Sequence, residues 1–140
     1  APEPPTQPRT SLTARYRELA VEHASSRRVD AVLRDHPRLS LCVPHPGADE
    51  FQSYVDLLDR HDNLWLDTSM AGSGFFPRGP DDLRAVLADR SERILYGTDF
   101  PYLPFAWDRE LKRILALELP DAALRNILSD TGRRLFVGDP

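Results

Sequence analysis

The sequence of 140 residues predicts an α/β fold built on a short parallel β-sheet. Three apolar runs, at about residues 39–43, 64–67 and 94–97, are each typical of a buried strand. Amphipathic segments long enough to form crossover helices separate these runs. Strands joined by such helices pair in parallel with right-handed connections, so the alternation indicates one parallel sheet.

The N-terminal part divides into an arm and a helical region. Residues 1–10 are rich in proline and poor in apolar side chains, which predicts a flexible arm, and residues 11–140 are expected to form the folded part. Apolar positions three and four apart over residues 12–33 predict a helix that is interrupted near Ser25. The helix is expected to end before Pro37, because the residue that precedes a proline is disfavoured in a helix.

Four further segments have helical character. Residues 49–60 place apolar side chains on one side and begin with acidic residues, as an amphipathic helix does. Pro80 and the two aspartates after it are typical of a helix start. Helices are also expected over about residues 108–117 and 120–128, with a last turn over residues 133–136. Three short parallel strands cannot close a barrel alone, so two strand edges are expected to remain unpaired.

Composition limits the possible partners. Hydrophobic residues make up 41% and charged residues 29%, which suits a folded protein, and the net charge is −4. This balance provides no basic surface for nucleic acid or an anionic membrane. No apolar run approaches the roughly 18 residues of a membrane span, and no signal-peptide pattern is present. Cys42 is the only cysteine, so no internal disulfide is possible, and a cytoplasmic location is expected.

A residue of catalytic type follows each predicted strand. His45 comes just after the first apolar run, Asp67 ends the second, and Asp99 follows the third. The carboxyl ends of parallel strands lie on one side of the sheet, where α/β enzymes place their active sites. The sequence therefore predicts that these three side chains share one edge of the sheet.

Each of the three residues has a functional and a structural interpretation. His45 lies between two prolines, and its imidazole can bind a divalent metal, act as a general base, or simply cap a turn. Asp99 has apolar neighbours, so it needs a metal, an imidazolium or turn amides as partners. Asp67 can orient a ligand, or it can accept hydrogen bonds from the amides of Thr68 and Ser69.

The loop after the third run and the remaining motifs are less informative. Phe100, Tyr102 and Trp107 can form the apolar wall of a substrate pocket or take part in ordinary packing. Cys42 is flanked by apolar residues, which favours a buried, inert thiol. The glycine-rich residues 72–79 lack a phosphate-binding motif, and the nucleophile motif of serine hydrolases is absent.

Four segments in this order resemble the amidohydrolase-related (amidohydrolase 2) family. They are Val43–Gly47, Asn63–Ser69, Glu92–Tyr102 and Leu128–Phe136. This family includes metal-dependent hydrolases and the aminocarboxymuconate semialdehyde and related decarboxylases. The similarity spans roughly residues 30–136, and the run from Glu92 through Gly-Thr-Asp-Phe-Pro is its most specific element.

The resemblance implies a (β/α)8 barrel and assigns roles within it. His45 matches the histidine after strand six of such barrels, which polarises the substrate or handles protons. Asp67 matches the acidic position after strand seven. Asp99 matches the metal-binding aspartate after strand eight, which can also assist a metal-bound water.

The sequence also departs from the family pattern. The His-x-His pair of the family's first strand and the histidine of its fifth strand are missing, and Thr131-Gly132 replaces the usual Asn-Ala. Metal sites of this kind use three or four protein ligands, and such a barrel needs about 250 residues. We therefore expect the chain to be the C-terminal part of a barrel, its last three strand-helix units. A zinc or manganese ion is expected in the complete enzyme but not to be held tightly by this chain alone.

Two functional hypotheses follow. In the first, the chain contributes to an enzyme that hydrolyses or decarboxylates a small carboxylic or cyclic substrate, with the missing N-terminal barrel half or a second copy of the chain as partner. In the second, it is a non-catalytic half-barrel module that pairs with itself or with a partner through its exposed strand edges.

Overall fold

The computed structural model describes residues 25–74, 76 and 79–138, and the predicted arm over residues 1–10 lies outside this part. The elements follow one another as α2 (Ser26–Asp35), β1 (Leu41–Val43), the irregular 3-10 segment η1 (His45–Glu50), α3 (Phe51–Arg60), β2 (Leu64–Asp67), α4 (Pro80–Asp89), the 3-10 turn η2 (Ser91–Arg93), β3 (Ile94–Leu95), α5 (Arg109–Ala116), α6 (Asp121–Arg125), the π-helical turn η3 (Asn126–Asp130) and α7 (Thr131–Phe136).

The three strands form one parallel sheet in the order β1-β2-β3, which confirms the predicted fold class. Leu41 lies opposite Leu64, and Leu66 lies opposite both Val43 and Ile94. β2 is therefore the central strand. The elements that flank it along the chain, α3 and α4, connect it to its two neighbours as crossover helices.

Two strands are shorter than the apolar runs that predicted them. The first strand begins at Leu41 because the Leu39 amide donates to the His36 carbonyl in a turn, at 2.9 Å. The third strand ends at Leu95 because the Tyr96 amide donates to the carbonyl of Ile127, also at 2.9 Å. In both places the backbone amide forms a hydrogen bond outside the sheet, so it does not pair with a neighbouring strand.

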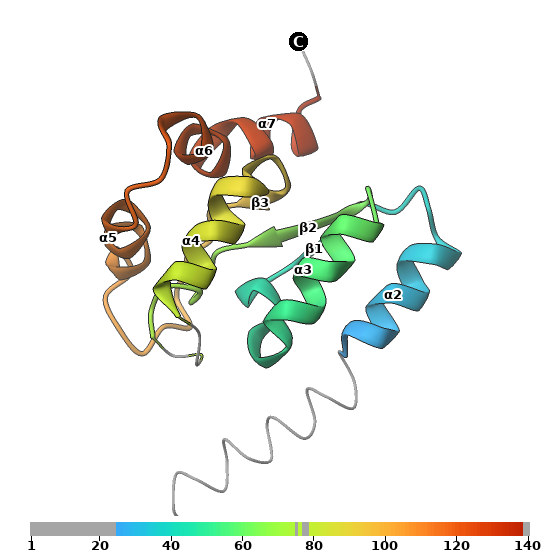
Figure 1. Ribbon diagram of the computed structural model, residues 1–140, viewed down its shortest axis with the longest axis horizontal. Coiled ribbons are helices and arrows are strands. Elements are labelled where there is room, and N and C mark those ends of the chain that lie inside the picture. The colour runs from blue at the N-terminus through green and yellow to red at the C-terminus, as the bar shows by residue number, and fades with distance from the viewer. Residues whose placement is uncertain (1–24, 75, 77–78, 139–140) are drawn as a thin grey trace, which may run out of the picture.

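One face of the sheet carries a row of helices. Figure 1 shows α2, α3 and α4 side by side, with β1 and β2 behind α3. The strand side chains on this face, Leu64, Leu66 and Ile94, are completely buried. Two apolar clusters fill the layer: Leu33, Tyr54, Leu57, Leu58, Leu64 and Leu66 form one, and Val55, Ala71, Leu83, Val86, Leu87, Ile94, Ile114, Leu119 and Ile127 form the other.

The opposite face of the sheet is covered only in part. Trp65 and Asp67 alternate with the buried leucines of β2 and are half-buried. Cys42, which pairs with Trp65, is also half-buried. Burial raises the pKa of the Cys42 thiol to about 11, and the negative charge of Asp67 adds to this shift. The thiol is thus protonated at neutral pH, which supports the inert role expected for it.

The C-terminal helices form a continuous helical segment that is held to β3 by a π-helical turn. The Thr131 amide donates to the carbonyl of Asn126, five residues back, and this spacing releases the Ile127 carbonyl. The released carbonyl accepts the Tyr96 amide at the end of β3. The π-helical turn therefore makes the Ile127 carbonyl available as the acceptor for the Tyr96 amide at the end of β3.

Thr131, one of the residues that depart from the family pattern, is part of the same attachment. Its hydroxyl donates to the Ser91 carbonyl at 3.0 Å, and its side chain is buried. The Asn126 side chain donates to the Ser91 hydroxyl at 3.1 Å. Both bonds fasten the C-terminal helices to the turn that precedes β3.

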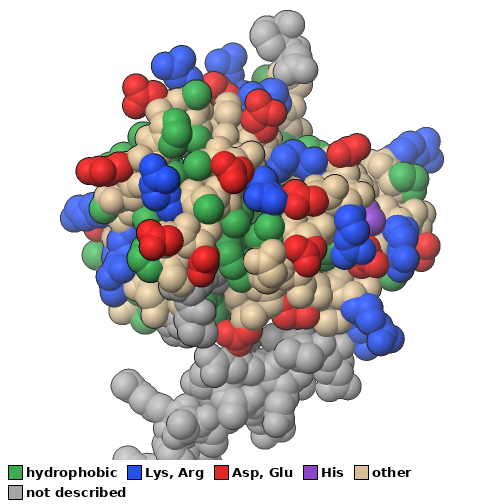
Figure 2. All heavy atoms as spheres, viewed as in Figure 1, with side chains coloured by type: hydrophobic (Ala, Val, Ile, Leu, Met, Phe, Trp, Pro, Cys, Tyr) green, Lys and Arg blue, Asp and Glu red, His purple; other side chains and the backbone are tan. Residues whose placement is uncertain are grey.

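Charged side chains are mixed over the helical face. Figure 2 shows acidic and basic groups interspersed there, with no area of a single sign. The face in view therefore presents charges of both signs. Among the described helices, none has both the length and the apolar character that a membrane crossing requires.

Replacing Leu66 by alanine is expected to lower the free energy of unfolding by roughly 2–5 kcal/mol, because a completely buried leucine of the central strand is removed. Urea denaturation followed by circular dichroism measures the change. Leu115→Ala is the matched control, since Leu115 is 49% exposed on α5 and its loss should cost less than about 0.5 kcal/mol. Equal losses for the two variants would contradict the assignment of the core.

Cys42 is expected to react slowly with iodoacetamide at pH 8. With a pKa of about 11 in place of the ordinary 9.0, the thiolate fraction at that pH, and with it the rate, falls roughly 100-fold. The rate should rise with pH through this range and reach the rate of a small free thiol after unfolding in urea. A reaction rate of the native protein equal to that of the unfolded protein would show that the Cys42 side of β1 is accessible to solvent.

Candidate functional site

A residue other than glycine adopts a left-handed backbone conformation after each strand. The φ angles are 61° at His45 after β1, 58° at Met70 after β2 and 65° at Asp99 after β3. Such conformations are unfavourable for side chains with a Cβ, and they occur more often at functional sites than elsewhere. His45, Met70 and Asp99 are three of the five non-glycine residues with positive φ in the described part, so backbone strain recurs at the carboxyl edge of the sheet.

His45 is held by the loop that follows β2. Its amide donates to the Ser69 hydroxyl at 3.2 Å, and its ring Nδ1 lies 3.1 Å from the same hydroxyl and 3.2 Å from the Ser69 carbonyl oxygen. The imidazole also contacts the ring of Phe76, with 5.9 Å between the ring centroids. One residue of the second strand end thus fixes both the backbone and the side chain of His45.

The carboxylate of Asp67 also contacts Ser69. Its Oδ1 accepts the Ser69 amide at 2.8 Å and also accepts the Ser69 hydroxyl. The expected bond from the Thr68 amide is not formed, because this amide donates to the Leu95 carbonyl and continues the sheet. The structure therefore joins His45 and Asp67 through the hydroxyl of Ser69, a residue that sequence reasoning considered only for its amide.

The end of β3 packs closely against Asp67. A Cβ at Gly97 would lie 2.7 Å from Asp67 Oδ1, closer than side-chain atoms normally approach. The Gly97 amide donates to the Thr68 hydroxyl at 3.2 Å. Glycine is thus required here because the carboxylate of Asp67 occupies the space of a side chain.

Asp99 lies in a tight turn that is closed without its side chain. Its backbone carbonyl accepts the Tyr102 amide at 2.8 Å, and the Thr98 hydroxyl accepts the Phe100 amide at 3.2 Å. The Asp99 carboxylate makes no hydrogen bond or ion pair with any residue in the described ranges, so the turn-amide interpretation of this side chain is wrong. The structure shows no contact that links Asp99 to His45 or Asp67.

The aromatic residues after β3 are exposed. Phe100, Tyr102 and Trp107 expose 70%, 84% and 60% of their surface, so they do not pack in the core that the described residues form. They lie in the loop that begins at Asp99 and leads to α5. The interpretation as a pocket wall remains a prediction, and ordinary packing within the described part does not account for them.

Glu110 is a buried acid close to this edge that the sequence did not reveal. It is 1% exposed, and its Oε1 accepts the Gly72 amide at 2.8 Å, which ties the loop after β2 to the start of α5. Burial raises the pKa of Tyr96, and the charges of Glu110 and Asp108 contribute to the same shift. An acidic residue in an amphipathic helix is normally solvated, so no sequence signal pointed to this role.

The described residues do not include a complete metal site. No group of three histidine, cysteine, aspartate or glutamate side chains within them is arranged to hold a metal ion. Asp99 has a carboxylate without a protein partner in this part, and one carboxylate is fewer than the three or four ligands that a zinc site uses. The three or more side-chain ligands of a zinc site are therefore not assembled within the described part.

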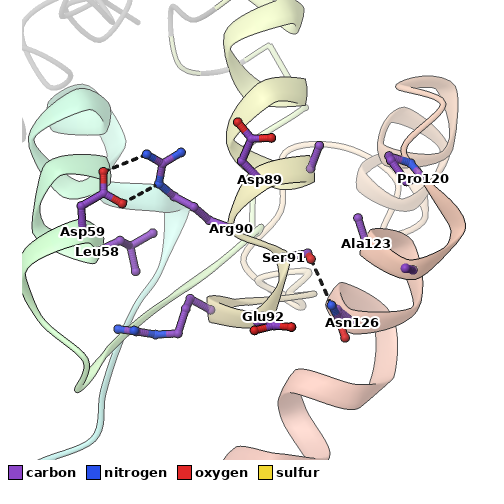
Figure 3. A pocket seen from close by; sticks show the side chains of 12 residues that line it. Leu58, Asp59, Asp89, Arg90, Ser91, Glu92, Pro120, Ala123 and Asn126 are labelled. Carbon is purple, nitrogen blue, oxygen red and sulfur yellow. Dashed lines mark hydrogen bonds and ion pairs between the residues drawn. The ribbon is translucent and has the colours of Figure 1, made fainter.

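A hollow lies at the opposite end of β3, away from these residues. It has a volume of about 470 Å³ and is lined by residues of α3, α4, η2 and α6 (Figure 3). Arg90 donates to both carboxylate oxygens of Asp59, at 2.9 and 2.8 Å, and Asn126 donates to Ser91. Because its lining includes the turn that precedes β3, this hollow is separate from the edge that carries His45, Asp67 and Asp99.

Comparison with solved structures supports the fold. The uncharacterised TIM-barrel protein Bb4693 of Bordetella bronchiseptica superimposes with a TM-score of 0.68 at 25% identity, over 79% of this chain and 38% of that chain. The Agrobacterium tumefaciens protein ATU3138, in an apo structure, gives a TM-score of 0.53 at 24% identity, over 79% of this chain and 48% of that chain. The chain therefore spans less than half of either protein and has the fold of part of a TIM barrel.

Comparison by sequence identifies the family. No curated protein matches the sequence. The sequence model of the amidohydrolase family matches residues 9–137, which is nearly the whole chain. Members of this family generally use divalent metals. The chain belongs to the amidohydrolase family.

Proposed function

We propose that this chain is the C-terminal part of a metal-dependent amidohydrolase-like enzyme that acts on a small carboxylic or cyclic substrate. The observation that carries the proposal is that His45, Asp67 and Asp99 each lie at the carboxyl end of a strand of one parallel sheet, in a chain of this family. Parallel barrels place their catalytic residues at this edge. The reaction is hydrolysis or non-oxidative decarboxylation.

Asp99 is the residue that we assign to the metal. Its carboxylate is not engaged by the described protein groups, and a carboxylate is a normal ligand for zinc or manganese. A bound divalent ion polarises a carbonyl group or activates a water molecule. The other ligands have to come from the missing N-terminal half of the barrel or from a partner chain.

His45 is the residue that we assign to proton transfer. Ser69 positions its ring through Nδ1 at the carboxyl edge of the sheet, and an imidazole is a common proton-transfer group in enzymes. Asp67 supports this ring through Ser69. Phe100, Tyr102 and Trp107 supply apolar surface for the carbon skeleton of the substrate.

The proposal also includes the cellular location of the enzyme and the surfaces through which this chain would pair. The single cysteine requires no oxidising compartment, so we place the protein in the cytoplasm. The N-terminal half of the barrel would pair with the edge strands β1 and β3 and cover the face of the sheet that is only partly buried. The exposed aromatic loop also favours the second candidate, a non-catalytic module, and the experiment below separates the two.

The chain is to be purified together with a polypeptide that carries the first five strand-helix units of a family barrel, including the His-x-His pair. We expect His45→Gln to reduce turnover on a panel of carboxylic esters, lactones and carboxylic acids by at least about 100-fold, because a proton-transfer group is lost. Asp99→Asn should reduce turnover and bound zinc or manganese together. Plasma mass spectrometry measures the metal.

Asp89→Asn is the control for these variants, because Asp89 is exposed and lines the hollow at the other end of β3. It should leave both turnover and metal content unchanged. Full assembly with unchanged metal content in Asp99→Asn, or full turnover in His45→Gln, would refute the assignment of that residue. Assembly without any turnover or metal in the wild type would favour the non-catalytic module.

Gly97→Ala is expected to displace the Asp67 carboxylate, since the added methyl group would lie 2.7 Å from Oδ1. Crowding of this kind typically costs about 1–3 kcal/mol of stability, which urea denaturation measures. Gly132→Ala is the control, because the nearest atom to its added Cβ would be 3.7 Å away. Equal stability of the two variants would show that Asp67 does not occupy this position.

A further inference from the structure

We infer that Arg109 binds a carboxylate group of the substrate at the carboxyl edge of the sheet, with Phe105 holding its guanidinium in place. The inference rests on the proposed function for the identity of the site, and it adds a residue that determines which substrates the site accepts. Arg109 is the first residue of α5. The loop that leads from β3 to this helix carries Phe105 and three exposed aromatic side chains.

The first observation is the set of partners that the half-buried arginines have. Arg90, Arg93 and Arg109 are the half-buried arginines of the described part. Arg90 donates to both carboxylate oxygens of Asp59, and Arg93 donates to two backbone carbonyls. The guanidinium of Arg109 forms no hydrogen bond or ion pair with an oxygen of any described residue. A partly desolvated cation without an acceptor is unfavourable, so this guanidinium is suited to an external anion.

The second observation is the contact between Arg109 and an aromatic ring. The central guanidinium carbon of Arg109 lies over the Phe105 ring, 5.0 Å from its centroid. The face of an aromatic ring attracts a cation, so Phe105 restricts the position of the guanidinium. The ring has no oxygen acceptor, however, and a guanidinium has five N–H donors. Arg109 is therefore held in place while its donors remain available to a ligand.

The acidic residues next to Arg109 in the sequence have other partners. Asp108 Oδ2 forms an ion pair with Lys112 Nζ at 2.6 Å, and this hydrogen bond lowers the pKa of the Asp108 carboxyl group below its ordinary value. Glu110 is buried, and its Oε1 accepts the Gly72 amide at 2.8 Å. Neither carboxylate forms an ion pair with Arg109. Its positive charge is therefore not neutralised by the acids nearest to it in the chain.

Two connections place Arg109 at the carboxyl edge of the sheet. The loop that follows the carboxyl end of β3 leads directly to Arg109. The bond between Glu110 and the Gly72 amide then ties the start of α5 to the loop after β2. The same β2 loop contains Ser69, which contacts His45. The start of α5 is therefore attached to the loop that holds the residue assigned to proton transfer.

A carboxylate is the ligand that suits this arrangement. A guanidinium presents its N–H donors in a planar fork that matches the two oxygens of a carboxylate. In the same loop, Phe100, Tyr102 and Trp107 expose 70%, 84% and 60% of their surface and offer apolar contacts to the rest of the ligand. A neutral compound of the same shape would leave the guanidinium without an anion. Arg109 thus favours anionic substrates over neutral ones.

Nuclear magnetic resonance of the 140-residue chain with ¹⁵N-labelled arginine tests the inference directly. The Nε–H signal of Arg109, identified by its loss in Arg109→Gln, is followed at constant ionic strength while para-fluorobenzoate is added. We expect a saturable shift that the neutral para-fluorobenzamide does not produce. The signal of Arg125, which is exposed on α6, serves as the internal control and should not saturate. A shift no larger than that of Arg125, or a shift with inorganic phosphate but not with the benzoate, would overturn the inference.

Three variants test the guanidinium and the ring, with affinities measured from the fluorine signal of para-fluorobenzoate. Arg109→Lys keeps the charge but loses the planar fork, so the affinity should fall about fivefold, the effect of one ordinary hydrogen bond. Phe105→Leu removes the aromatic face and keeps an apolar side chain, so the affinity should fall about two- to fivefold. Arg125→Gln is the matched control and should leave the affinity unchanged. Equal affinities of Arg109→Lys, Arg109→Gln and the wild type would overturn the inference.

The chain assembled with the N-terminal barrel half tests the effect on specificity. Arg109→Gln should raise KM at least about tenfold for lactones and esters that carry a free carboxylate, because a charge-assisted hydrogen bond is lost. KM for the neutral amides of the same compounds should change little. An equal rise for both sets would overturn the selection of anionic substrates. A wild-type assembly without turnover would refute the proposed function, whereas the benzoate titration would still decide whether Arg109 binds a carboxylate, so the two proposals can fail separately.

Discussion

The parallel pairing of β2 with a strand on each side is the interaction on which the rest of the structure depends. It buries Leu64 and Leu66 against the helices and brings the ends of all three strands to one edge. Arg93, just before β3, secures the beginning of β2 by donating to the Leu64 and His61 carbonyls. Its guanidinium also lies 5.0 Å from the Trp65 ring, so a half-buried cation is held by carbonyls and an aromatic face together.

The fold could be predicted from the sequence because its signals are local. The three apolar runs and the helical periods between them identify the three strands of the described part and the helices α3 to α6 without any knowledge of their partners. The exact strand ends could not be predicted, because they depend on distant groups. Leu39 has its amide in a turn, and Tyr96 gives its amide to Ile127, which lies 31 positions further along the chain.

The candidate site follows the same division between local and distant signals. His45, Asp67 and Asp99 could be found because each follows a strand, and a parallel sheet brings strand ends together. The role of Ser69 could not be found, because its hydroxyl becomes a link only when β1 and β2 pair in this register. Glu110 was missed for a similar reason, since its partner, the Gly72 amide, is 38 residues away.

The two faces of the sheet are covered to different extents, and Asp67 lies on the less covered face. Helices completely bury Leu64, Leu66 and Ile94 on one face, whereas Trp65, Asp67 and Cys42 on the other face stay half-buried. Apolar area that remains in contact with water forfeits about 25 cal/mol per Å², so this face gains stability when further strands cover it. Asp67 extends from the same face and is already held by Ser69. Closure of a barrel over it would therefore enclose the hydrogen-bonded group of His45, Asp67 and Ser69, which the pairing of β1 and β2 has already assembled.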